Sequence, residues 1–310
     1  MSADLANTPY PRDLLGYGAN PPHANWPNNK RLALNFVINY EEGGERSMMD
    51  GDGMAESYLA DLPGLPPIPG ERSLFTESVF EYGSRTGIWR LLNLFKQHDI
   101  KVTIYGIAQA LERNPDVVKA IVEADHEVAN HAMRWIDYSI IDEAEEKRQL
   151  DESIRIIEKL TGQRPLGWYC GRFSQNTHRL VAEEGGFLYN SDDYSDDLPF
   201  WREIAGHQQL IVPYTIDAND MRFCTLNGFG DGEQFFQYLK DCFDVLYEEG
   251  SQTQRMMTVG LHGRLSGRPA RFAGLKRFVE YVKSFDDVWL CKRVEIARHW
   301  HENHPPASKL

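Results

Sequence analysis

The sequence predicts one α/β domain in which short, mostly parallel strands alternate with helices and close into a barrel. Apolar, β-rich runs alternate along the chain with amphipathic segments, an order typical of βα units and a parallel sheet. The length of 310 residues fits a single α/β barrel, and hydrophobic residues at 42% can fill a large core. Neither an internal repeat nor a second core is evident, which favours a single domain over two.

The composition excludes several classes of partner. A net charge of −13 and a pI near 5.3 argue against binding to nucleic acid or to an acidic membrane surface. We find no secretory signal and no apolar run approaching the ~20 residues that span a bilayer. The cysteines are scattered and predict free thiols in a reducing cytoplasm: Cys170, Cys224, Cys242 and Cys291.

Three parts are expected along the chain: an irregular N-terminal arm over residues 1–30, the domain itself over 31–304, and a tail over 305–310. The first strand is expected from Leu32 to Asn39. A long segment without sustained periodicity follows over residues 43–83, and its apolar side chains favour an ordered loop that covers something over a flexible linker.

The remaining elements follow in alternation, and several are marked by capping residues. Ser84 and Asn114 can each cap a helix, and Asp142 with Glu145 resembles a capping box that opens a helix closed by Gly162. Strands are expected at residues 102–105, 127–129, 166–169, 187–190, 210–213, 256–261 and 288–291. Helices are expected from 84, from 115, and at 142–162, 176–184, 232–249, 269–284 and 294–301.

Polar side chains follow several of these strands, where a parallel barrel carries its catalytic groups. They are Glu41, Glu42, His131, Arg172, Asp192, Asp193 and His262. Any one of them alone is a weak signal, so the prediction of a site depends on their convergence from distant positions. Hydrolytic chemistry could use such carboxylates and histidines as general bases and acids.

Each of these residues also has a structural alternative. Neighbours on a strand point to opposite faces, so one of Glu41 and Glu42 can enter the site while the other orients a loop, or both can lie in a solvated turn. His131 could be a ligand, an acid or a backbone-bonded structural histidine, and His262, followed by glycine, is the stronger functional candidate. Arg172 could bind an anion or a ureido carbonyl, or pair with Asp192.

Three segments resemble the polysaccharide deacetylase (NodB-homology) family: Asn39-Tyr40-Glu41-Glu42-Gly43, His126-Glu127-Val128-Ala129-Asn130-His131 and Val259-Gly260-Leu261-His262. The family pattern is an acidic pair after the first strand, a Glu-aliphatic-small-Asn-His segment and a late Leu-any-His. The resemblance covers about residues 30–300 and implies an irregular (β/α)7 barrel.

The sequence departs from the family pattern at the metal ligands. Glu41 and Glu42 stand where the family has two aspartates, and Trp135 stands where the second histidine of its His-any-any-any-His pair would be. Gly171-Arg172-Phe173 stands in place of the family's arginine-proline motif. We therefore expect no metal and no other cofactor.

These departures, the long loop and Arg85-Thr86-Gly87-Ile88-Trp89 resemble the cofactor-independent allantoinase branch of the family, with close matches over residues 35–45 and 168–176. The resemblance implies hydrolysis of the hydantoin ring of allantoin to allantoate in cytoplasmic purine breakdown. It also implies a homotetramer, a small-molecule ureide substrate, and neither nucleic acid nor membrane as a partner.

The resemblance also implies roles for the residues at the matching positions. Glu41 would activate water, His262 would protonate the leaving nitrogen, and Glu42 and His131 would hold water or the ureido group. Trp135 would occupy the metal's place and pack on the ring.

Arg172 would stabilise the oxyanion, and Tyr169 and Asp192 are expected at the substrate. The alternatives are a metal-dependent N-deacetylase of an amino sugar, a hydrolase of another cyclic amide or imide, and a ligand-binding pseudoenzyme.

Overall fold

The computed structural model describes residues 12–61 and 66–306, so the outer ends of the predicted arm and tail and four residues of the long loop lie outside the described residues. A single curled sheet forms its centre, with the strand order β6-β7-β5-β4-β3-β2-β1-β8 and with β9 beside β1. All pairings are parallel except that of β6 with β7. The strands are β1 (Leu32–Tyr40), β2 (Thr103–Gly106), β3 (Glu127–Asn130), β4 (Gly167–Trp168), β5 (Tyr189–Asn190), β6 (Phe200–Ile204), β7 (His207–Ile211), β8 (Arg255–His262) and β9 (Val288–Leu290).

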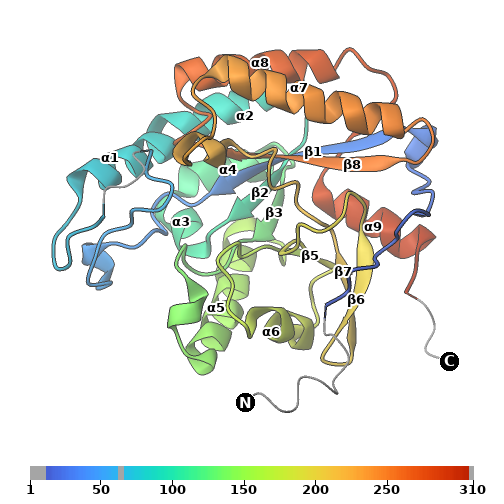
Figure 1. Cartoon of the computed structure of the whole chain (residues 1–310). Coiled ribbons are helices and arrows are strands. Elements are labelled where there is room, and N and C mark those ends of the chain that lie inside the picture. The colour runs from blue at the N-terminus through green and yellow to red at the C-terminus, as the bar shows by residue number, and fades with distance from the viewer. Residues whose placement is uncertain (1–11, 62–65, 307–310) are drawn as a thin grey trace.

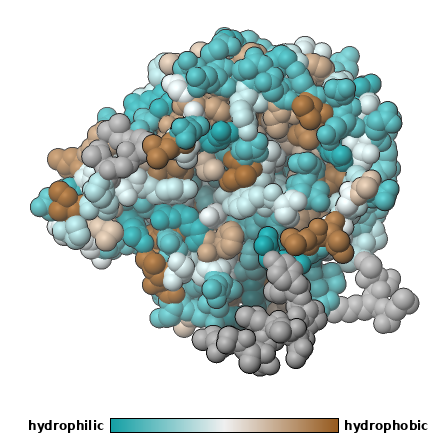
Figure 2. All heavy atoms as spheres, viewed as in Figure 1, coloured by the Kyte–Doolittle hydropathy of each residue, from teal (hydrophilic) through white to brown (hydrophobic). Residues whose placement is uncertain are grey.

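Helices cover the outside of the curled sheet, with α7 and α8 together over β1 and β8, and α5 and α6 at the opposite end (Figure 1). They are α1 (Leu74–Tyr82), α2 (Ile88–Gln97), α3 (Ala108–Arg113), α4 (Pro115–Glu123), α5 (Glu143–Thr161), α6 (Thr177–Glu184), α7 (Gly232–Glu249), α8 (Pro269–Val282) and α9 (Arg293–Asn303). This half-barrel confirms the predicted α/β class. None of the described helices is long and apolar enough to span a bilayer. The face shown in Figure 2 is mainly hydrophilic, with its apolar residues in small separate groups.

Most predicted elements are confirmed, with the helix ends set by their capping residues. The side chain of Asn114 accepts a hydrogen bond from the Val117 amide at the start of α4, and Asp142 does the same for Glu145 at the start of α5. Gly162, at φ 75°, ends α5 in the left-handed conformation that glycine favours.

The predicted loop over residues 43–83 is wrong at its end, because α1 lies within it. Ser73 caps α1 by accepting a hydrogen bond from the Thr76 amide. Ser84 does not begin a helix; it lies in a π-helical turn, Gly83–Gly87, that joins α1 directly to α2. Its hydroxyl is 3.0 Å from that of Tyr40. Other chain segments pass close to both glycines of this turn: a Cβ at Gly83 would meet the Glu42 carboxylate, and a Cβ at Gly87 would meet the backbone of Gly263.

The prediction also missed α3 and the antiparallel hairpin of β6 and β7. The hairpin turns at Ala205 and Gly206, which both have positive φ, and its strands are polar and partly exposed. Without an apolar run to mark it, the hairpin could not be recognised, and the strand expected at 210–213 begins earlier, at His207.

Two C-terminal histidines hold the inner end of the N-terminal arm. The ring nitrogens of His299 and His304 lie 2.8 and 3.1 Å from the carbonyl oxygen of Ala24. The neighbouring Trp26 is buried and packs against Trp300, with ring centroids 5.7 Å apart. His299 and His304 are partly buried structural groups.

The register of the sheet brings the predicted site residues to one edge. Asn39 of β1 is paired with His262 of β8, and Tyr40 is paired with Gly106 of β2. Gly106 is in turn paired with Asn130 of β3. Glu41, His131 and His262 therefore lie at the same edge of the sheet, at the carboxyl ends of β1, β3 and β8.

Candidate active site

A cavity of about 300 Å³ opens at the carboxyl ends of β1, β3 and β8. Aromatic and apolar side chains make up much of its wall, and a few polar groups converge on it, a composition typical of small-molecule sites. It is lined by Asn39, Glu41, Tyr58, Leu59, His131, Trp135, Tyr169, Gly171, Arg172, Tyr194, Ile216, Asn219, Met221 and His262.

The carboxylate of Glu41 is the centre of this site. Its Oε1 lies 3.3 Å from Nε2 of His131 and 3.3 Å from Nε2 of His262. Its Oε2 accepts a 2.6 Å hydrogen bond from Arg264. Burial alone would raise the pKa of Glu41, but the positive charges of Arg264 and then His262 hold it well below its usual value. Glu41 is therefore ionised at neutral pH.

His262 is oriented and charged by Asp220, which lies in the segment before α7. The Nδ1 of His262 is 2.6 Å from one oxygen of Asp220, whose other oxygen accepts from the backbone amides of His262 and Ser266. Burial lowers the pKa of His262, but the charges of Glu41 and Asp220 outweigh it and raise that pKa to about 9. The ring is thus protonated at neutral pH, with its Nε2 proton toward Glu41 and the cavity.

The two ring nitrogens of His131 face a backbone carbonyl and the carboxylate of Glu41. Its Nδ1 lies 2.9 Å from the carbonyl oxygen of Tyr169, so this nitrogen carries the donated proton. Its Nε2 lies 3.3 Å from Oε1 of Glu41, within hydrogen-bonding distance of the carboxylate. Tyr169 lines the cavity, and its ring stacks on Tyr105 with centroids 4.6 Å apart.

Arg264 is the main residue that the sequence analysis missed. Its guanidinium is buried, with Nη2 on Glu41 and Nη1 3.6 Å from Glu42. Its Nε donates to the carbonyl of Leu59 at 3.1 Å, and its guanidinium carbon lies 5.0 Å from the ring centre of Trp135. The arginine follows His262 by two positions, but nothing local in the sequence indicates that it turns back to the first strand.

The structure corrects the prediction that Glu42 holds water or substrate. Glu42 is buried but is not among the residues that line the cavity. Its carboxylate accepts a hydrogen bond from the Arg264 amide at 3.2 Å, and burial raises its pKa. The two glutamates thus face different surroundings, as expected for neighbours at the end of a strand. Glu41 lines the cavity, and Glu42 contacts Arg264 on the side away from it.

The structure also corrects the expectation that Asp192 lies at the substrate. Asp192 is buried behind the cavity wall, where it accepts hydrogen bonds from the amides of Cys170 and Gly171 and from the indole of Trp168. It shapes the loop that follows β4 and does not line the cavity. The neighbouring Asp193 is paired with Arg202 at 2.7 Å.

Arg172 does line the cavity, but the pairing that the sequence suggested is wrong. Its Nη1 donates to Glu56, at 2.9 Å, and to the carbonyl of Trp135, at 3.2 Å, and not to Asp192. Glu56 comes from the loop after β1, a segment in which no residue was singled out from the sequence.

The donor set does not fit the zinc site that the wider family implies. Trp135 lies at the second histidine position and is 4% exposed, and Arg264 holds the second oxygen of Glu41. Within residues 12–61 and 66–306, no three His, Cys, Asp or Glu side chains are placed to hold a metal ion. A catalytic zinc needs three protein ligands, and here the nearby positive charge comes from a guanidinium.

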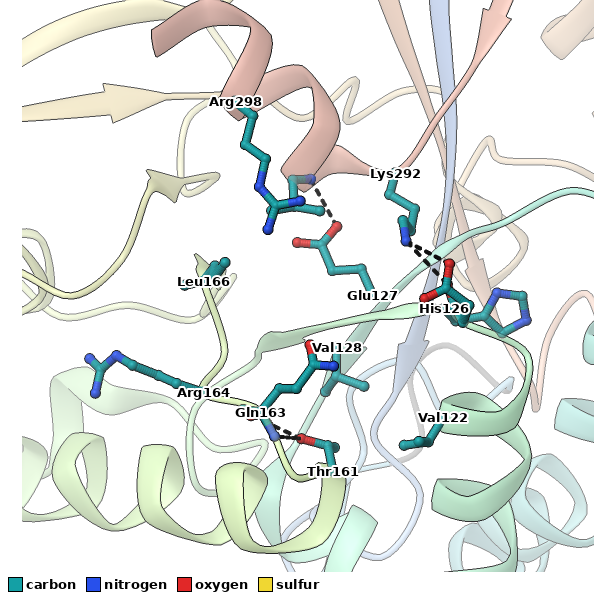
Figure 3. A pocket seen from close by; sticks show the side chains of 12 residues that line it. Val122, His126, Glu127, Val128, Thr161, Gln163, Arg164, Leu166, Lys292 and Arg298 are labelled. Carbon is teal, nitrogen blue, oxygen red and sulfur yellow. Dashed lines mark hydrogen bonds and ion pairs between the residues drawn. The ribbon is translucent and has the colours of Figure 1, made fainter. Parts of the chain in front are cut away.

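A second cavity, of about 210 Å³, lies at the amino end of β3 (Figure 3). Its charged groups bond to its own wall: Lys292 lies 3.1 Å from Asp125, and Glu127 accepts a 2.9 Å hydrogen bond from the Val294 amide at the start of α9. Arg298 reaches over it from α9. These balanced charges do not resemble the acid–base arrangement around Glu41.

Comparison with known proteins gives the same family as the sequence motifs. The family model described as polysaccharide deacetylase matches residues 76–188. A Schizosaccharomyces pombe protein whose name places it among the polysaccharide deacetylases is 44% identical over 95% of this chain and 98% of its own length.

Two crystal structures are similar over nearly the whole chain. A probable polysaccharide deacetylase from Pseudomonas aeruginosa is 55% identical, covers 96% of this chain and 100% of its own, and has a TM-score of 0.94. The structure of PuuE allantoinase is also 55% identical, with coverage of 97% and 100% and a TM-score of 0.95. These similarities confirm the NodB-type β/α barrel. The chain belongs to the polysaccharide deacetylase family.

Proposed function

We propose that the protein is an allantoinase that opens the hydantoin ring of allantoin to allantoate without a resident metal. The observation that carries this proposal is the Glu41 carboxylate, placed between two histidines and a buried arginine at a small cavity. A hydrolase of cyclic amides needs an activated water, a stabilised oxyanion and a proton for the leaving nitrogen. The 55% identity with the PuuE allantoinase structure supports the same reaction.

In the proposed first step, Glu41 takes a proton from a water molecule as its oxygen attacks the ring carbonyl. The new C–O bond forms while the carbonyl electrons move to oxygen, giving a tetrahedral oxyanion. His131, whose Nε2 faces the same carboxylate oxygen at 3.3 Å, orients the water. The guanidinium of Arg172, in the cavity wall, donates to the oxyanion.

In the second step, the ring C–N bond breaks as His262 donates its Nε2 proton to the leaving nitrogen. The raised pKa of His262, about 9, keeps this proton available at neutral pH. The proton on Glu41 then passes across the 3.3 Å gap to Nε2 of His262, which restores the resting state. The product carboxyl group ionises.

The resemblance also bears on the metabolic role and the oligomeric state of the protein. On the resemblance to the allantoinase branch, we propose a role in cytoplasmic purine breakdown and a homotetrameric assembly. Light scattering on the purified protein tests the assembly, and a monomer at micromolar concentration would contradict it.

The decisive experiment measures allantoate production by enzyme freed of metal with a chelator and checked by elemental analysis. We expect full turnover of allantoin by the metal-free enzyme, no turnover by Glu41→Gln, and a kcat reduced on the order of 10²–10⁴-fold in His262→Ala. Activity that depends on an added divalent ion would overturn the metal-free mechanism.

A panel of other substrates tests the rival functions. Release of acetate from N-acetylated sugars with no turnover of allantoin would indicate an N-deacetylase. Turnover of other cyclic amides or imides alone would change the substrate, and binding without any turnover would indicate a pseudoenzyme.

A further inference from the structure

The loop between β1 and α1 forms part of the cavity wall. Tyr58 and Leu59 from this loop line the cavity. Several arginines tie the loop to the barrel; among them, Arg134 pairs with Asp52 at 2.6 Å, and Arg264 donates to the Leu59 carbonyl at 3.1 Å. These bonds to the barrel therefore fix the loop side chains that line the cavity.

Glu56 is the buried carboxylate of this loop, and its two oxygens have separate tasks. It is 5% exposed. One oxygen accepts from the amides of Ser57 and Tyr58, both at 2.9 Å, and the other accepts from Arg172 at 2.9 Å. Because the two backbone bonds fix the carboxylate, the ion pair fixes the guanidinium as well.

Arg172 is held by one nitrogen only. Both of its hydrogen bonds to described residues start from Nη1, which donates to Glu56 and to the Trp135 carbonyl. Its guanidinium carbon also lies 5.0 Å from the ring centre of Trp135 and 5.4 Å from that of Tyr58. This geometry leaves Nε and Nη2, the remaining edge of the planar fork, for a ligand in the cavity.

The wall beside this edge is aromatic and flat. The rings of Tyr58 and Trp135 stack with centroids 5.8 Å apart and planes 21° from parallel. Trp135 is buried and backs this wall, while Tyr58 is exposed. A flat ring with in-plane carbonyl oxygens can pack against the Tyr58 ring and accept hydrogen bonds from the arginine edge at the same time. A sugar ring is puckered and offers no such plane.

We infer that Glu56 is a positioning residue for Arg172, and that the pair makes the cavity selective for a small, flat cyclic ureide. The inference rests on the proposed function and deepens it, because it assigns substrate recognition to a residue of the β1–α1 loop. Glu56 itself does not touch the substrate. It acts by turning the free edge of Arg172 into the cavity.

The test compares Glu56→Gln with a matched control from the same loop. The amide introduced by this substitution would set its own N–H groups against the guanidinium donors, so Arg172 loses its fixed orientation. We expect kcat/KM for allantoin to fall about tenfold or more, with both a higher KM and a lower kcat, because the same edge of Arg172 would bind the ring carbonyl and the oxyanion formed from it. Asp61→Asn removes another loop ion pair, the one with Arg271 at 2.6 Å, and should leave kcat/KM unchanged.

A double variant and a conservative variant complete the test. In an Arg172→Gln background, which should itself raise KM, adding Glu56→Gln should have no further effect. Arg172→Lys keeps the charge but loses the planar edge, so its KM should also rise, and this variant serves if Glu56→Gln does not fold.

The outcomes separate the inference from the proposed function. If the wild type hydrolyses allantoin but Glu56→Gln matches Asp61→Asn, or Arg172→Lys matches the wild type, the positioning role is wrong and the function stands. If the wild type neither binds nor hydrolyses allantoin or hydantoin, both are wrong.

Discussion

In the proposed mechanism, Asp220 determines the pH range over which His262 can act as an acid. Its carboxylate lies 2.6 Å from Nδ1 of His262, and its charge is one of the two that raise the pKa of that ring to about 9. A general acid must be protonated to work, so the rate is expected to be steady below this pKa and to fall tenfold per pH unit above it. Neither residue is close to the other in sequence, since 42 positions separate them.

The substitution Asp220→Asn tests this role. Removing the negative charge lowers the proton affinity of His262, so the alkaline fall of kcat/KM should move from near pH 9 to lower pH. The measurement is a pH–rate profile of both proteins. Asp241→Asn, on the exposed side of α7, is the control and should leave the profile unchanged. An identical alkaline limb in the wild type and Asp220→Asn would contradict the assignment.

Arg264 explains how a family site can keep its first carboxylate while losing its metal ligands. The guanidinium bonds Glu41, is backed by Glu42 and packs against Trp135 and Phe80. A cation is thus supplied by the chain itself. It keeps Glu41 ionised, and the tryptophan that takes a ligand's position becomes the surface on which the guanidinium rests.

At the scale of elements, the π-helical turn between α1 and α2 is built around close approach to the site. A Cβ added at Gly83 would lie 2.2 Å from Oε1 of Glu42 and 2.8 Å from the backbone nitrogen of Arg264. The backbone of Gly83 is ordinary right-handed helix, so the glycine is needed for space and not for its dihedral freedom. The turn therefore sets the position of Glu42, and through it that of Arg264.

We expect Gly83→Ala to destabilise the protein by about 1–3 kcal/mol, the usual cost of overpacking, even though alanine is the better helix former. Because the carboxylate of Glu42 must move, kcat should fall as well. Urea denaturation and steady-state kinetics measure the two effects. The control is Ser78→Ala, on the exposed side of α1, whose free energy of unfolding should stay within about 0.5 kcal/mol of the wild type. An equally small change in Gly83→Ala would contradict the prediction, because it would show that the turn can accommodate a Cβ.

The sequence predicted the elements whose signals are local. The helix expected over 232–249 matches α7 at both ends, where the Asp231 side chain caps the first turn and Gly250 follows the last residue. Three of the site residues, Glu41, His131 and His262, were found because each lies at the end of a strand, and the parallel register brings those strand ends together.

What the sequence could not predict is which distant residue each side chain meets. Arg264 and Glu41 are 223 positions apart, and Arg172 and Glu56 are 116 apart. For the same reason Asp192 was expected at the substrate: its position after β5 is right for a site residue, but it bonds to backbone amides behind the cavity wall. Proximity to a strand end indicates the region, and only tertiary packing decides the partner.

At the scale of the whole molecule, a buried arginine joins chain segments from the two ends of the curled sheet. Arg293, at the start of α9, is fully buried and donates to Asn35 of β1 and Thr258 of β8 at 3.1 and 2.6 Å. On the other side it donates to Ser191, at 2.9 Å, and to the carbonyls of Val212 and Pro213, in the segments after β5 and β7. These strands come from the two ends of the sheet order.

This arrangement predicts that Arg293 stabilises the half-barrel more than any exposed cation on the same helix. In Arg293→Met, buried carbonyl and hydroxyl groups from both ends of the sheet lose their shared donor, and each unsatisfied group costs about 1–3 kcal/mol. We expect the free energy of unfolding, measured by urea denaturation at neutral pH, to fall by about 3–5 kcal/mol, as when a buried charged network is broken.

The control for this prediction is Arg298→Met, which removes an exposed arginine from the same helix and should change the free energy of unfolding by less than about 0.5 kcal/mol. Arg293→Lys keeps the charge but cannot reach both sides of the sheet with a planar fork, so its loss should lie between those of the two methionine variants. Because the same strands carry Glu41 and His262, kcat should fall together with stability in the Arg293 series. Equal stabilities of Arg293→Met and Arg298→Met would show that strand pairing and the packed core alone keep the two ends of the sheet together.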